Sequence, residues 1–380
     1  MQTSPNRGGT KKTPDPVSPL RVVIAGGGTG GHLYPGIAVA QELRSRQPDA
    51  VISFAGTAKG IESRVVPREG FALDLLRSGG LKGKSAVDRV KGVALLPLGL
   101  LDAWHIVSKR RPDLVIGVGG YSAGPVVLVG AMRGVPAMLL EQNAVPGLTN
   151  RLLAPFVRAA GVTFESTRTF FGAKAFVSGN PVRPEFLGTI GSRDEAGAND
   201  AITEVLVFGG SQGAHAINVA MVAAAPVLAA RGSGLRFTHQ TGEHDLEMVR
   251  TAYRAAGLAA DVEPFLYDMG RRLGGADLIL CRAGATTLAE ITASGKAAIL
   301  IPFPAATDDH QRRNAVALAE AGAAEVLLQQ DLTGPVLAER LLALAADRTR
   351  RARMAAAARA LARPDAARVI VDRALELVKR

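Results

Sequence analysis

Two glycine-rich turns, each between an apolar run and an Ala/Leu-rich segment, constrain the fold of this chain of 380 residues most strongly. The first lies within Val22-Val-Ile-Ala-Gly-Gly-Gly-Thr-Gly-Gly-His32 and the second within Leu206-Val-Phe-Gly-Gly-Ser-Gln-Gly-Ala-His215. A strand, a glycine turn and a helix in this order are typical of βαβ units, which build parallel sheets. Because the pattern restarts in the second half, we expect an α/β protein with two tandem Rossmann-like domains whose parallel sheets face a cleft.

Short apolar runs mark the expected strands, which lie at residues 21–25, 51–55, 113–117, 137–140, 204–208, 235–239, 277–281 and 298–301. Residues 21–182 form the first predicted domain and residues 183–363 the second. Residues 1–20 are rich in Pro, Thr and Lys and lack an apolar run, which predicts a disordered arm and not a signal peptide. Residues 364–380 predict an amphipathic helix that can close against either domain, with the N-terminal domain favoured.

The net charge of +11 is carried entirely by the first half of the chain. Residues 1–182 hold 22 Lys and Arg against 11 Asp and Glu, whereas residues 183–380 hold 23 of each. Such a bias favours an anionic partner: nucleic acid, an anionic membrane surface or a phosphorylated substrate. Nucleic acid is disfavoured because only 4% of the residues are aromatic and no RNA-binding motif is visible. A single cysteine, Cys281, excludes a disulfide scaffold and a Cys-rich zinc site.

Residues 79–104 combine cations with apolar bulk. The apolar run 93–101 is far shorter than the ~20 residues that a membrane-spanning helix needs. An ordinary buried helix explains the pattern, and the alternative is a surface segment that dips into an anionic bilayer. The first-half charge favours the alternative, and the predicted membrane-contact residues are Lys82, Lys84, Leu95, Leu96, Leu98 and Trp104.

The first glycine turn formally contains a G-x-G-x-x-G pattern, in which backbone N–H groups and a helix N-terminus favour an anion. A dinucleotide site also needs an acidic residue ~20 positions further on, at the end of the second strand. That strand ends at Phe54-Ala-Gly-Thr57 without a carboxylate, which disfavours an NAD-dependent oxidoreductase. His32 lies on the turn at the start of the helix. Its imidazole is a candidate general base or substrate contact, and stabilisation of the loop is the alternative role.

The second half carries a comparable set of polar groups. The turn Gly209-Gly-Ser-Gln-Gly213 offers N–H groups and the Ser211 hydroxyl to a phosphate. Glu290 lies in the predicted helix that follows Cys281-Arg-Ala-Gly-Ala-Thr-Thr287. Its carboxylate either interacts favourably with the dipole at the N-terminus of this helix or binds the diol of a ribose. The glycine turn in the same domain favours the ribose. Arg183 either clamps a phosphate or forms an interdomain salt bridge.

Two more polar segments follow predicted strands. Glu141-Gln-Asn143 comes directly after the strand that ends at Leu140, so these side chains are expected at the carboxyl edge of a sheet. Asp308-Asp309-His310-Gln311 suggests a metal, but no ligand set with suitable spacing accompanies it. Amide and imidazole groups hydrogen-bond sugar hydroxyls well, which favours a sugar ligand there.

These motifs, in this order, resemble those of the MurG family over about residues 21–375. The resemblance rests on the two glycine turns, Gly119-Gly-Tyr-Ser122, Glu141-Gln-Asn143, Gly179-Asn-Pro-Val-Arg183, Ala285 to Glu290 and Gln311 to Ala315. The family transfers N-acetylglucosamine (GlcNAc) from UDP-GlcNAc to undecaprenyl-pyrophosphoryl-N-acetylmuramoyl-pentapeptide (lipid I) and forms lipid II for peptidoglycan. The resemblance implies the glycosyltransferase B fold, in which two Rossmann-like domains enclose the cleft.

The resemblance also implies roles for individual residues. The C-terminal domain would hold UDP-GlcNAc, with the uracil at Leu266, the ribose at Glu290, the diphosphate at Arg183 and the sugar at Gln311. The family often has a glutamine pair where this chain has His310-Gln311. The complete expected substrate-binding set is Thr29, Gly30, Gly31, Asn143, Arg183, Ser211, Gln212, Leu266, Ala285, Thr286, Thr287, Leu288, Ala289, Glu290 and Gln311.

The expected reaction is an inverting transfer without a cofactor or a metal, because no DxD-type metal site is apparent. The expected partners are UDP-GlcNAc, lipid I and the anionic membrane surface, with cell-wall or division proteins as further partners and no nucleic acid. We therefore expect a peripheral protein at the cytoplasmic face of the inner membrane that serves cell shape and division. One alternative is another glycosyltransferase B enzyme acting on a glycolipid, and another is a non-catalytic basic membrane- or nucleic-acid-binding protein.

Overall fold

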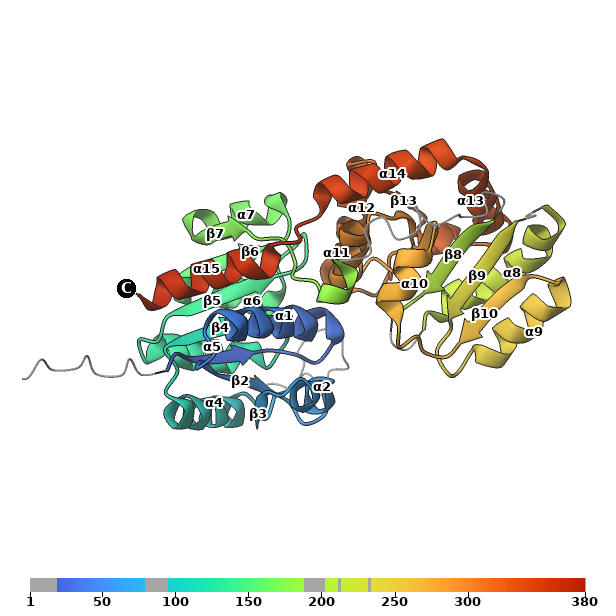
Figure 1. The fold of residues 1–380 in the computed structure, drawn as a ribbon. Coiled ribbons are helices and arrows are strands. Elements are labelled where there is room, and N and C mark those ends of the chain that lie inside the picture. Colours follow the sequence, from blue (N-terminus) through green and yellow to red (C-terminus); the bar gives the residue numbers. More distant parts are fainter. Residues whose placement is uncertain (1–18, 79–94, 188–201, 211–212, 232–233, 380) are drawn as a thin grey trace, which may run out of the picture.

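The computed structural model describes residues 19–78, 95–187, 202–210, 213–231 and 234–379. Within these ranges the chain forms two α/β domains that lie side by side, each a parallel sheet covered by helices on both faces (Figure 1). The two-domain parallel architecture predicted from the repeated strand–turn–helix pattern is confirmed. Four residues with expected roles, Lys82, Lys84, Ser211 and Gln212, lie outside the described residues, as does most of the N-terminal arm.

The N-terminal domain is built on a seven-stranded parallel sheet in the order β3-β2-β1-β4-β5-β6-β7. Its strands are β1 (Arg21–Ala25), β2 (Val51–Gly56), β3 (Ala72–Leu75), β4 (Leu114–Gly117), β5 (Ala137–Glu141), β6 (Ala159–Val162) and β7 (Ala175–Val177). The central strands β4 and β5 are buried along their whole length because helices cover both faces of the sheet. The strand order reverses between β1 and β4, and in such sheets ligands bind where the carboxyl ends of the strands diverge.

The helices of this domain pack on the sheet through two separate apolar cores. They are α1 (Gly30–Arg46), α2 (Glu62–Arg68), α4 (Leu96–Arg110), α5 (Ala123–Met132), α6 (Leu148–Leu153) and α7 (Glu165–Phe171). The C-terminal helix α15 (Ala366–Val378) crosses back from the other domain and packs against α1, so that Ile370 and Val371 join the same core as Ile24 and Leu43.

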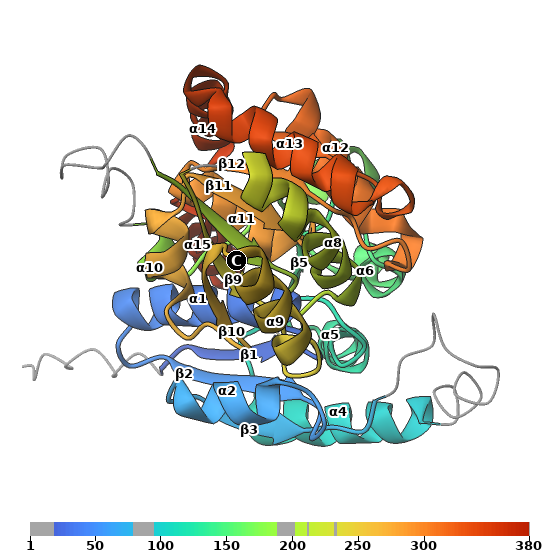
Figure 2. The same ribbon diagram turned by 90° about the vertical axis from the view of Figure 1, so that its right-hand side faces the viewer.

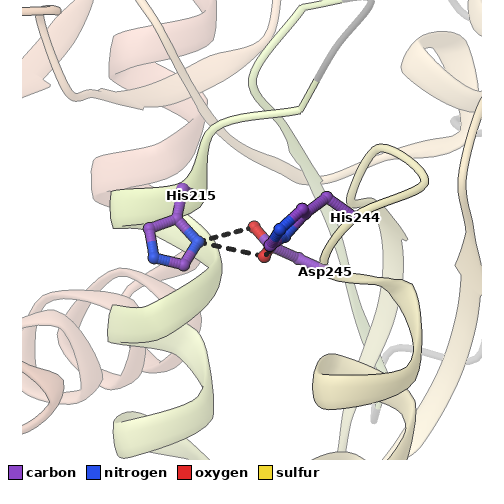
Figure 3. Close-up of side chains that lie close together, drawn as sticks. All are labelled: His215, His244 and Asp245. Atoms are coloured by element: carbon purple, nitrogen blue, oxygen red, sulfur yellow. Dashed lines mark hydrogen bonds and ion pairs between the residues drawn. The ribbon is translucent and has the colours of Figure 1, made fainter.

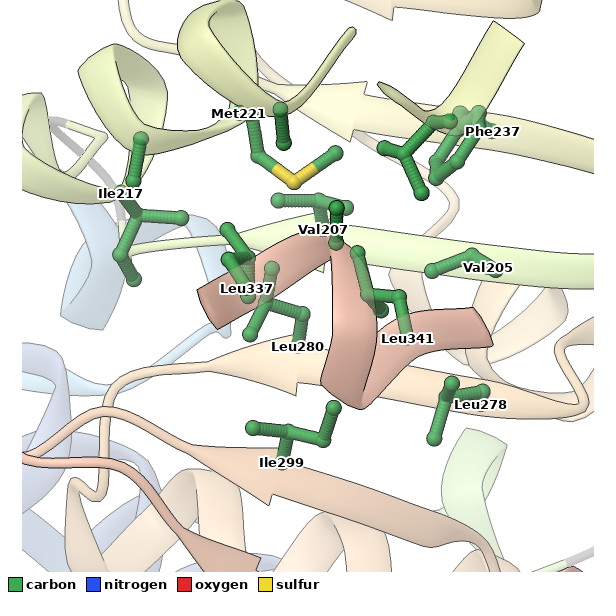
Figure 4. Close-up of a cluster of buried hydrophobic side chains, with 14 of the residues drawn as sticks. Val205, Val207, Ile217, Met221, Phe237, Leu278, Leu280, Ile299, Leu337 and Leu341 are labelled. Atoms are coloured by element: carbon green, nitrogen blue, oxygen red, sulfur yellow. The ribbon is translucent and has the colours of Figure 1, made fainter. Parts of the chain in front are cut away.

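The C-terminal domain has a six-stranded parallel sheet in the order β10-β9-β8-β11-β12-β13. Its strands are β8 (Thr203–Phe208), β9 (Leu235–Gln240), β10 (Ala259–Glu263), β11 (Leu278–Cys281), β12 (Ala297–Leu300) and β13 (Ala324–Val326). Its helices are α8 (His215–Arg231), α9 (Leu246–Ala256), α10 (Met269–Gly275), α11 (Ala285–Ser294), α12 (His310–Glu320), α13 (Gly334–Ala346) and α14 (Arg348–Leu361). Figure 4 shows one core, in which Val207 and Leu280 of the sheet meet Met221 of α8 and Leu337 of α13.

The two domains carry different outer surfaces. Figure 2 shows α4 on the side of the N-terminal domain remote from the C-terminal domain. This helix buries Ala103, Ile106 and Val107 against the sheet but leaves Leu101 64% and Trp104 52% exposed. No helix in the described parts of the chain has the length and apolar character needed to cross a bilayer.

Candidate functional site

The predicted site residues of the two domains meet where the carboxyl ends of β1, β4 and β5 face the N-termini of α11 and α12. Thr286, in the first turn of α11, donates its hydroxyl to the carbonyl oxygen of Gly31 at 3.0 Å. The amide of Asn180, in the segment between the domains, lies 3.5 Å from the same hydroxyl. The tertiary structure thus joins the first glycine turn to the turn that precedes Glu290.

The first glycine turn has a backbone that only glycine tolerates. Gly26, Gly27 and Gly28 all have positive φ angles. A Cβ atom on Gly26 would lie 2.4 Å from the carbonyl oxygen of Gly119, so the turn packs directly on the loop after β4. Thr29 is the N-cap of α1 and is exposed together with Gly28. The turn therefore leaves its backbone at Gly28 and Thr29 exposed.

Glu62, which the sequence did not single out, stabilises this turn through hydrogen bonds. It is fully buried, and its carboxylate accepts hydrogen bonds from the backbone N–H of Gly28 at 2.8 Å, the N–H of Thr57 at 2.8 Å and the Thr57 hydroxyl at 2.9 Å. A Cβ atom on Gly27 would lie 2.6 Å from this carboxylate. No carboxylate ends β2, as predicted, but Glu62 reaches the same place from the following helix. Its acceptors are engaged by the chain itself, so it is not free to hold a ribose.

His32 is held in one tautomer by a chain of hydrogen bonds. The Gln142 side-chain amide donates to the carbonyl oxygen of Val118 at 3.1 Å, which turns its oxygen toward Nδ1 of His32 at 3.2 Å. Nδ1 must then carry the proton, and Nε2 keeps a lone pair in the neutral ring. The space for the imidazole depends on Gly119, because a Cβ atom there would lie 2.7 Å from Nδ1.

The surroundings of His32 favour its neutral form. Burial lowers the pKa of His32, while the negative charge of Glu141 and the hydrogen bond to Gln142 oppose this effect. His310, at the start of α12 in the other domain, lowers the pKa further. A neutral imidazole with a free Nε2 has the form that a general base requires.

Glu141 organises the loop that carries Asn143. The carboxylate is buried and accepts hydrogen bonds from the N–H groups of Asn143 and Gly147, both at 3.0 Å, and from the side-chain amide of Asn150 at 2.8 Å. It also lies 3.3 Å from the side-chain amide nitrogen of Asn143. These bonds occupy both carboxylate oxygens, so Glu141 supports the site without facing a ligand.

Asn314 joins this loop to the other domain and was likewise not among the predicted site residues. It is fully buried on α12. Its oxygen accepts from the N–H of Ala144 at 2.9 Å, and its nitrogen donates to the side-chain oxygen of Asn143 at 3.2 Å and to the carbonyl of Ala283 at 3.4 Å. Asn143 is thereby positioned from both domains.

In the C-terminal domain, Glu290 lies in α11 with Arg183 beside it. An Nη2–Oε1 distance of 3.4 Å separates the two groups, and Glu290 is buried. Burial raises the pKa of Glu290 to about 7, although Arg183 opposes this shift. Arg183 also pairs with Glu185 at 3.0 Å and lies over the ring of Tyr34 of α1 at 4.8 Å. Its guanidinium therefore reaches from the C-terminal side to the wall of the N-terminal domain.

The remaining predicted residues lie around these groups. Thr287 is half-buried in the first turn of α11, and Leu266 is buried just after β10. Ala285, Leu288 and Ala289 line a cavity of about 210 Å³ together with Asn180 and other residues between the domains. Leu288 is at the same time part of the apolar core.

Gln311 lies in α12 of the C-terminal domain, and the described membrane-contact residues lie on or beside α4 of the N-terminal domain. The Gln311 side chain accepts from the N–H of Phe303 at 3.0 Å. Leu96 and Leu98 are exposed on α4 near Trp104, whereas Leu95 is half-buried. The guanidinium of Arg133 lies over the Trp104 ring at 4.8 Å, which places a cation beside the exposed apolar side chains.

The chain is similar to known proteins over nearly its whole length. Residues 22–162 match the glycosyltransferase family 28 N-terminal domain, and residues 204–370 match the family 28 C-terminal domain. A relative from Pelobacter propionicus, named UDP-N-acetylglucosamine--N-acetylmuramyl-(pentapeptide) pyrophosphoryl-undecaprenol N-acetylglucosamine transferase, is 47% identical over 94% of this chain and 99% of its own length. A relative of the same name from Geobacter metallireducens is 47% identical, covering 93% of this chain and 97% of that protein. The crystal structure of Acinetobacter baumannii MurG superposes with a TM-score of 0.77 at 32% identity, over 94% of this chain and 100% of that chain.

Proposed function

The chain belongs to glycosyltransferase family 28 and, within it, to the MurG family, and from this premise we propose that it transfers GlcNAc from UDP-GlcNAc to the 4-hydroxyl of the muramoyl sugar of lipid I, forming lipid II. The observation that carries the proposal is that groups suited to the two substrates lie on the two facing surfaces, or walls, where the domains meet. His32 lies on one wall, Glu290 with Arg183 lies on the other, and the Thr286–Gly31 hydrogen bond joins the walls at 3.0 Å.

The C-terminal wall suits a nucleotide sugar. A carboxylate with two acceptor oxygens can take both hydroxyls of a ribose, which is the role we propose for Glu290. Arg183 and the N-terminus of α11, at Ala285–Thr287, would stabilise the diphosphate because both favour negative charge. The glycine turn at 209–213 would add backbone N–H groups, Leu266 would meet the uracil, and Gln311 would bind sugar hydroxyls.

The N-terminal wall suits the acceptor. In the proposed reaction the acceptor hydroxyl oxygen attacks the anomeric carbon from the face opposite UDP and forms a β-linkage. Nε2 of His32 takes the hydroxyl proton, and the bond between the anomeric carbon and the phosphate oxygen breaks with its electron pair going to UDP. Asn143 and the backbone at Thr29–Gly31 would orient the reacting sugars. Developing charge on UDP would be stabilised by Arg183 and the N–H groups of α11.

We further propose that α4 attaches the protein to the membrane that carries the acceptor. The exposed Leu96, Leu98, Leu101 and Trp104 would enter the interface, and Arg133 would meet anionic headgroups. This arrangement supports a peripheral location at the cytoplasmic face of the inner membrane. Cell-wall and division proteins at that membrane are the proposed partners in cell shape and division.

Release of UDP from UDP-GlcNAc in the presence of a lipid I analogue tests the central proposal. We expect turnover that requires the muramoyl acceptor and continues in EDTA, since no metal or other cofactor enters the proposed reaction. Turnover with a glycolipid that lacks the muramoyl sugar, and none with lipid I, would instead support another glycosyltransferase B activity. Release that stops in EDTA and returns with a divalent ion would contradict metal independence.

A further inference from the structure

A second cluster of titratable side chains lies in the C-terminal domain, beyond the carboxyl end of β9 (Figure 3). His215 begins α8, and His244 and Asp245 belong to the loop between β9 and α9. Nδ1 of His215 lies 3.0 Å from each carboxylate oxygen of Asp245, and Nδ1 of His244 lies 3.0 Å from Oδ1. Each of the two imidazoles, from separate elements, therefore points one ring nitrogen at the same carboxylate.

The side chain of Asp245 does not cap its helix, although an aspartate at this position usually does. It is the N-cap residue of α9, yet its side chain makes no capping hydrogen bond. It is only 5% exposed, and its Oδ2 accepts from the Asn218 side-chain amide at 2.7 Å. Asn218 also donates to the carbonyl of Thr241 and is hydrogen-bonded to His239. A buried network thus turns the carboxylate away from its own helix and toward the two imidazoles.

The charge of Asp245 has no permanent counter-ion among the residues that the structure describes, since its ion-pair partners there are the two histidines. Burial alone raises the pKa of Asp245, but hydrogen bonds from Asn218, His244 and His215 bring it below its usual value. A buried carboxylate toward which two imidazole nitrogens point offers three ligand atoms to one cation.

We propose that His215, His244 and Asp245 bind one divalent transition-metal ion of the Zn²⁺ type, with the remaining coordination open to water. Their candidate ligand atoms all lie within 4.8 Å of one another. Ligands at 2.0–2.1 Å from a tetrahedral zinc ion are about 3.4 Å apart, so small side-chain rotations would bring them into place. Imidazole nitrogens favour Zn²⁺ over Mg²⁺ and Ca²⁺, which prefer oxygen ligands. The hydrogen bond from Asn218 is the kind of support that a ligating carboxylate usually receives.

The two histidines and the aspartate would play different parts. The side chain of His244 is 95% exposed and that of His215 is 69% exposed, so both can move toward an ion. Asp245 supplies the fixed, negatively charged ligand. A bound ion would tie the β9–α9 loop to the first turn of α8. None of the three residues takes part in the sugar transfer proposed above, so that reaction would still proceed in EDTA.

Titration calorimetry of the full chain with ZnCl₂, after treatment with EDTA and its removal, tests the proposal. We expect one equivalent of Zn²⁺ to bind, with affinity reduced about tenfold or more by His244→Ala and by His215→Ala. Co²⁺ should bind at the same site and give a visible ligand-field absorption that both substitutions abolish. His105→Ala, which removes an exposed imidazole on α4 in the other domain, is the matched control and should leave binding unchanged.

The outcomes separate a metal site from a purely hydrogen-bonded cluster. His244→Ala should fold normally because that side chain is almost fully exposed, and circular dichroism checks this. Zn²⁺ should raise the melting temperature of the unaltered chain and not that of His244→Ala. Absence of saturable Zn²⁺ and Co²⁺ binding would overturn the proposal. Binding that survives both His244→Ala and His215→Ala would overturn it as well.

Discussion

The two walls of the cleft use buried carboxylates in opposite ways. In the N-terminal domain, Glu62 and Glu141 each accept several hydrogen bonds from backbone N–H groups and nearby side chains, so they shape loops. In the C-terminal domain, the carboxylate of Glu290 accepts a hydrogen bond of 3.4 Å from Arg183 within the described part of the chain. A carboxylate whose oxygens all accept hydrogen bonds from the protein supports the structure of a site. A carboxylate with unused acceptor positions and a raised pKa, such as Glu290, can instead bind a ligand.

The largest effect is expected at His32, since Glu62 and Glu141 shape the loops of this domain and His32 is the group proposed to react. His32→Ala should lower kcat by about 10²–10⁴-fold, because a general base contributes on that scale, while the KM for UDP-GlcNAc changes little. Steady-state kinetics with a lipid I analogue measure both constants. A kcat near that of the unaltered enzyme would remove His32 from the chemistry.

Glu62 should behave as a structural support. Glu62→Ala should reduce the free energy of unfolding by about 3 kcal/mol or more, because it removes a buried carboxylate and leaves the partly buried N–H groups of Gly28 and Thr57 without this acceptor. Denaturant unfolding measures the loss. Glu69→Ala, which removes a half-buried carboxylate of the same domain bonded to the Gln41 side chain, serves as the control and should lose much less. Equal losses in both variants would contradict a special role for Glu62.

Glu290 should behave as a ligand-binding group. Glu290→Ala should weaken UDP-GlcNAc binding by about 10–100-fold, corresponding to the loss of hydrogen bonds to a charged acceptor, and should leave the acceptor KM nearly unchanged. Calorimetry with UDP-GlcNAc provides the measurement. Unchanged affinity would show that Glu290 only stabilises its helix, and the proposed difference between the two walls would then be wrong.

The raised pKa of Glu290 also predicts a pH dependence of stability without ligand. The folded state holds its proton up to about pH 7, whereas the unfolded chain releases it near 4.5. Between these values the folded state binds more protons, so stability falls as pH rises, by about 2 kcal/mol from pH 5 to pH 7. Glu290→Gln should remove this slope, as followed by urea unfolding at each pH. The same slope in both proteins would assign it to other groups.

The smallest expected effect concerns the outer surfaces of the domains. Trp104→Ser together with Leu101→Ser should reduce binding to anionic liposomes severalfold, since the two partly exposed side chains together contribute on the order of 1 kcal/mol at an interface. Turnover of a water-soluble acceptor analogue should stay unchanged. The matched control is Phe303→Ser, an exposed aromatic on the C-terminal domain. Co-sedimentation that is equally sensitive to both changes would contradict a membrane role confined to α4.

Strand prediction succeeded for the central strands and missed the four edge strands together with β6, which lies next to an edge. All eight runs expected as strands are strands, within a residue or two at their ends. The sequence missed β3, β6, β7, β10 and β13, which are three to five residues long. Strands such as Ala72–Leu75 and Ala259–Glu263 carry polar or exposed residues and lack a long apolar run. Their pairing with a neighbour defines them more than their own composition does.

The sequence by itself determined the two Rossmann-like units, the glycine turns and the identity of the residues with reactive or polar side chains. It did so because strand, turn and helix preferences are local and because only glycine tolerates the backbone of residues 26–28. The tertiary structure alone decided which groups support and which face a ligand. Glu62, Gln142 and Asn314 act through partners 34, 110 and 170 residues away in the chain, and no spacing in the sequence encodes such a contact.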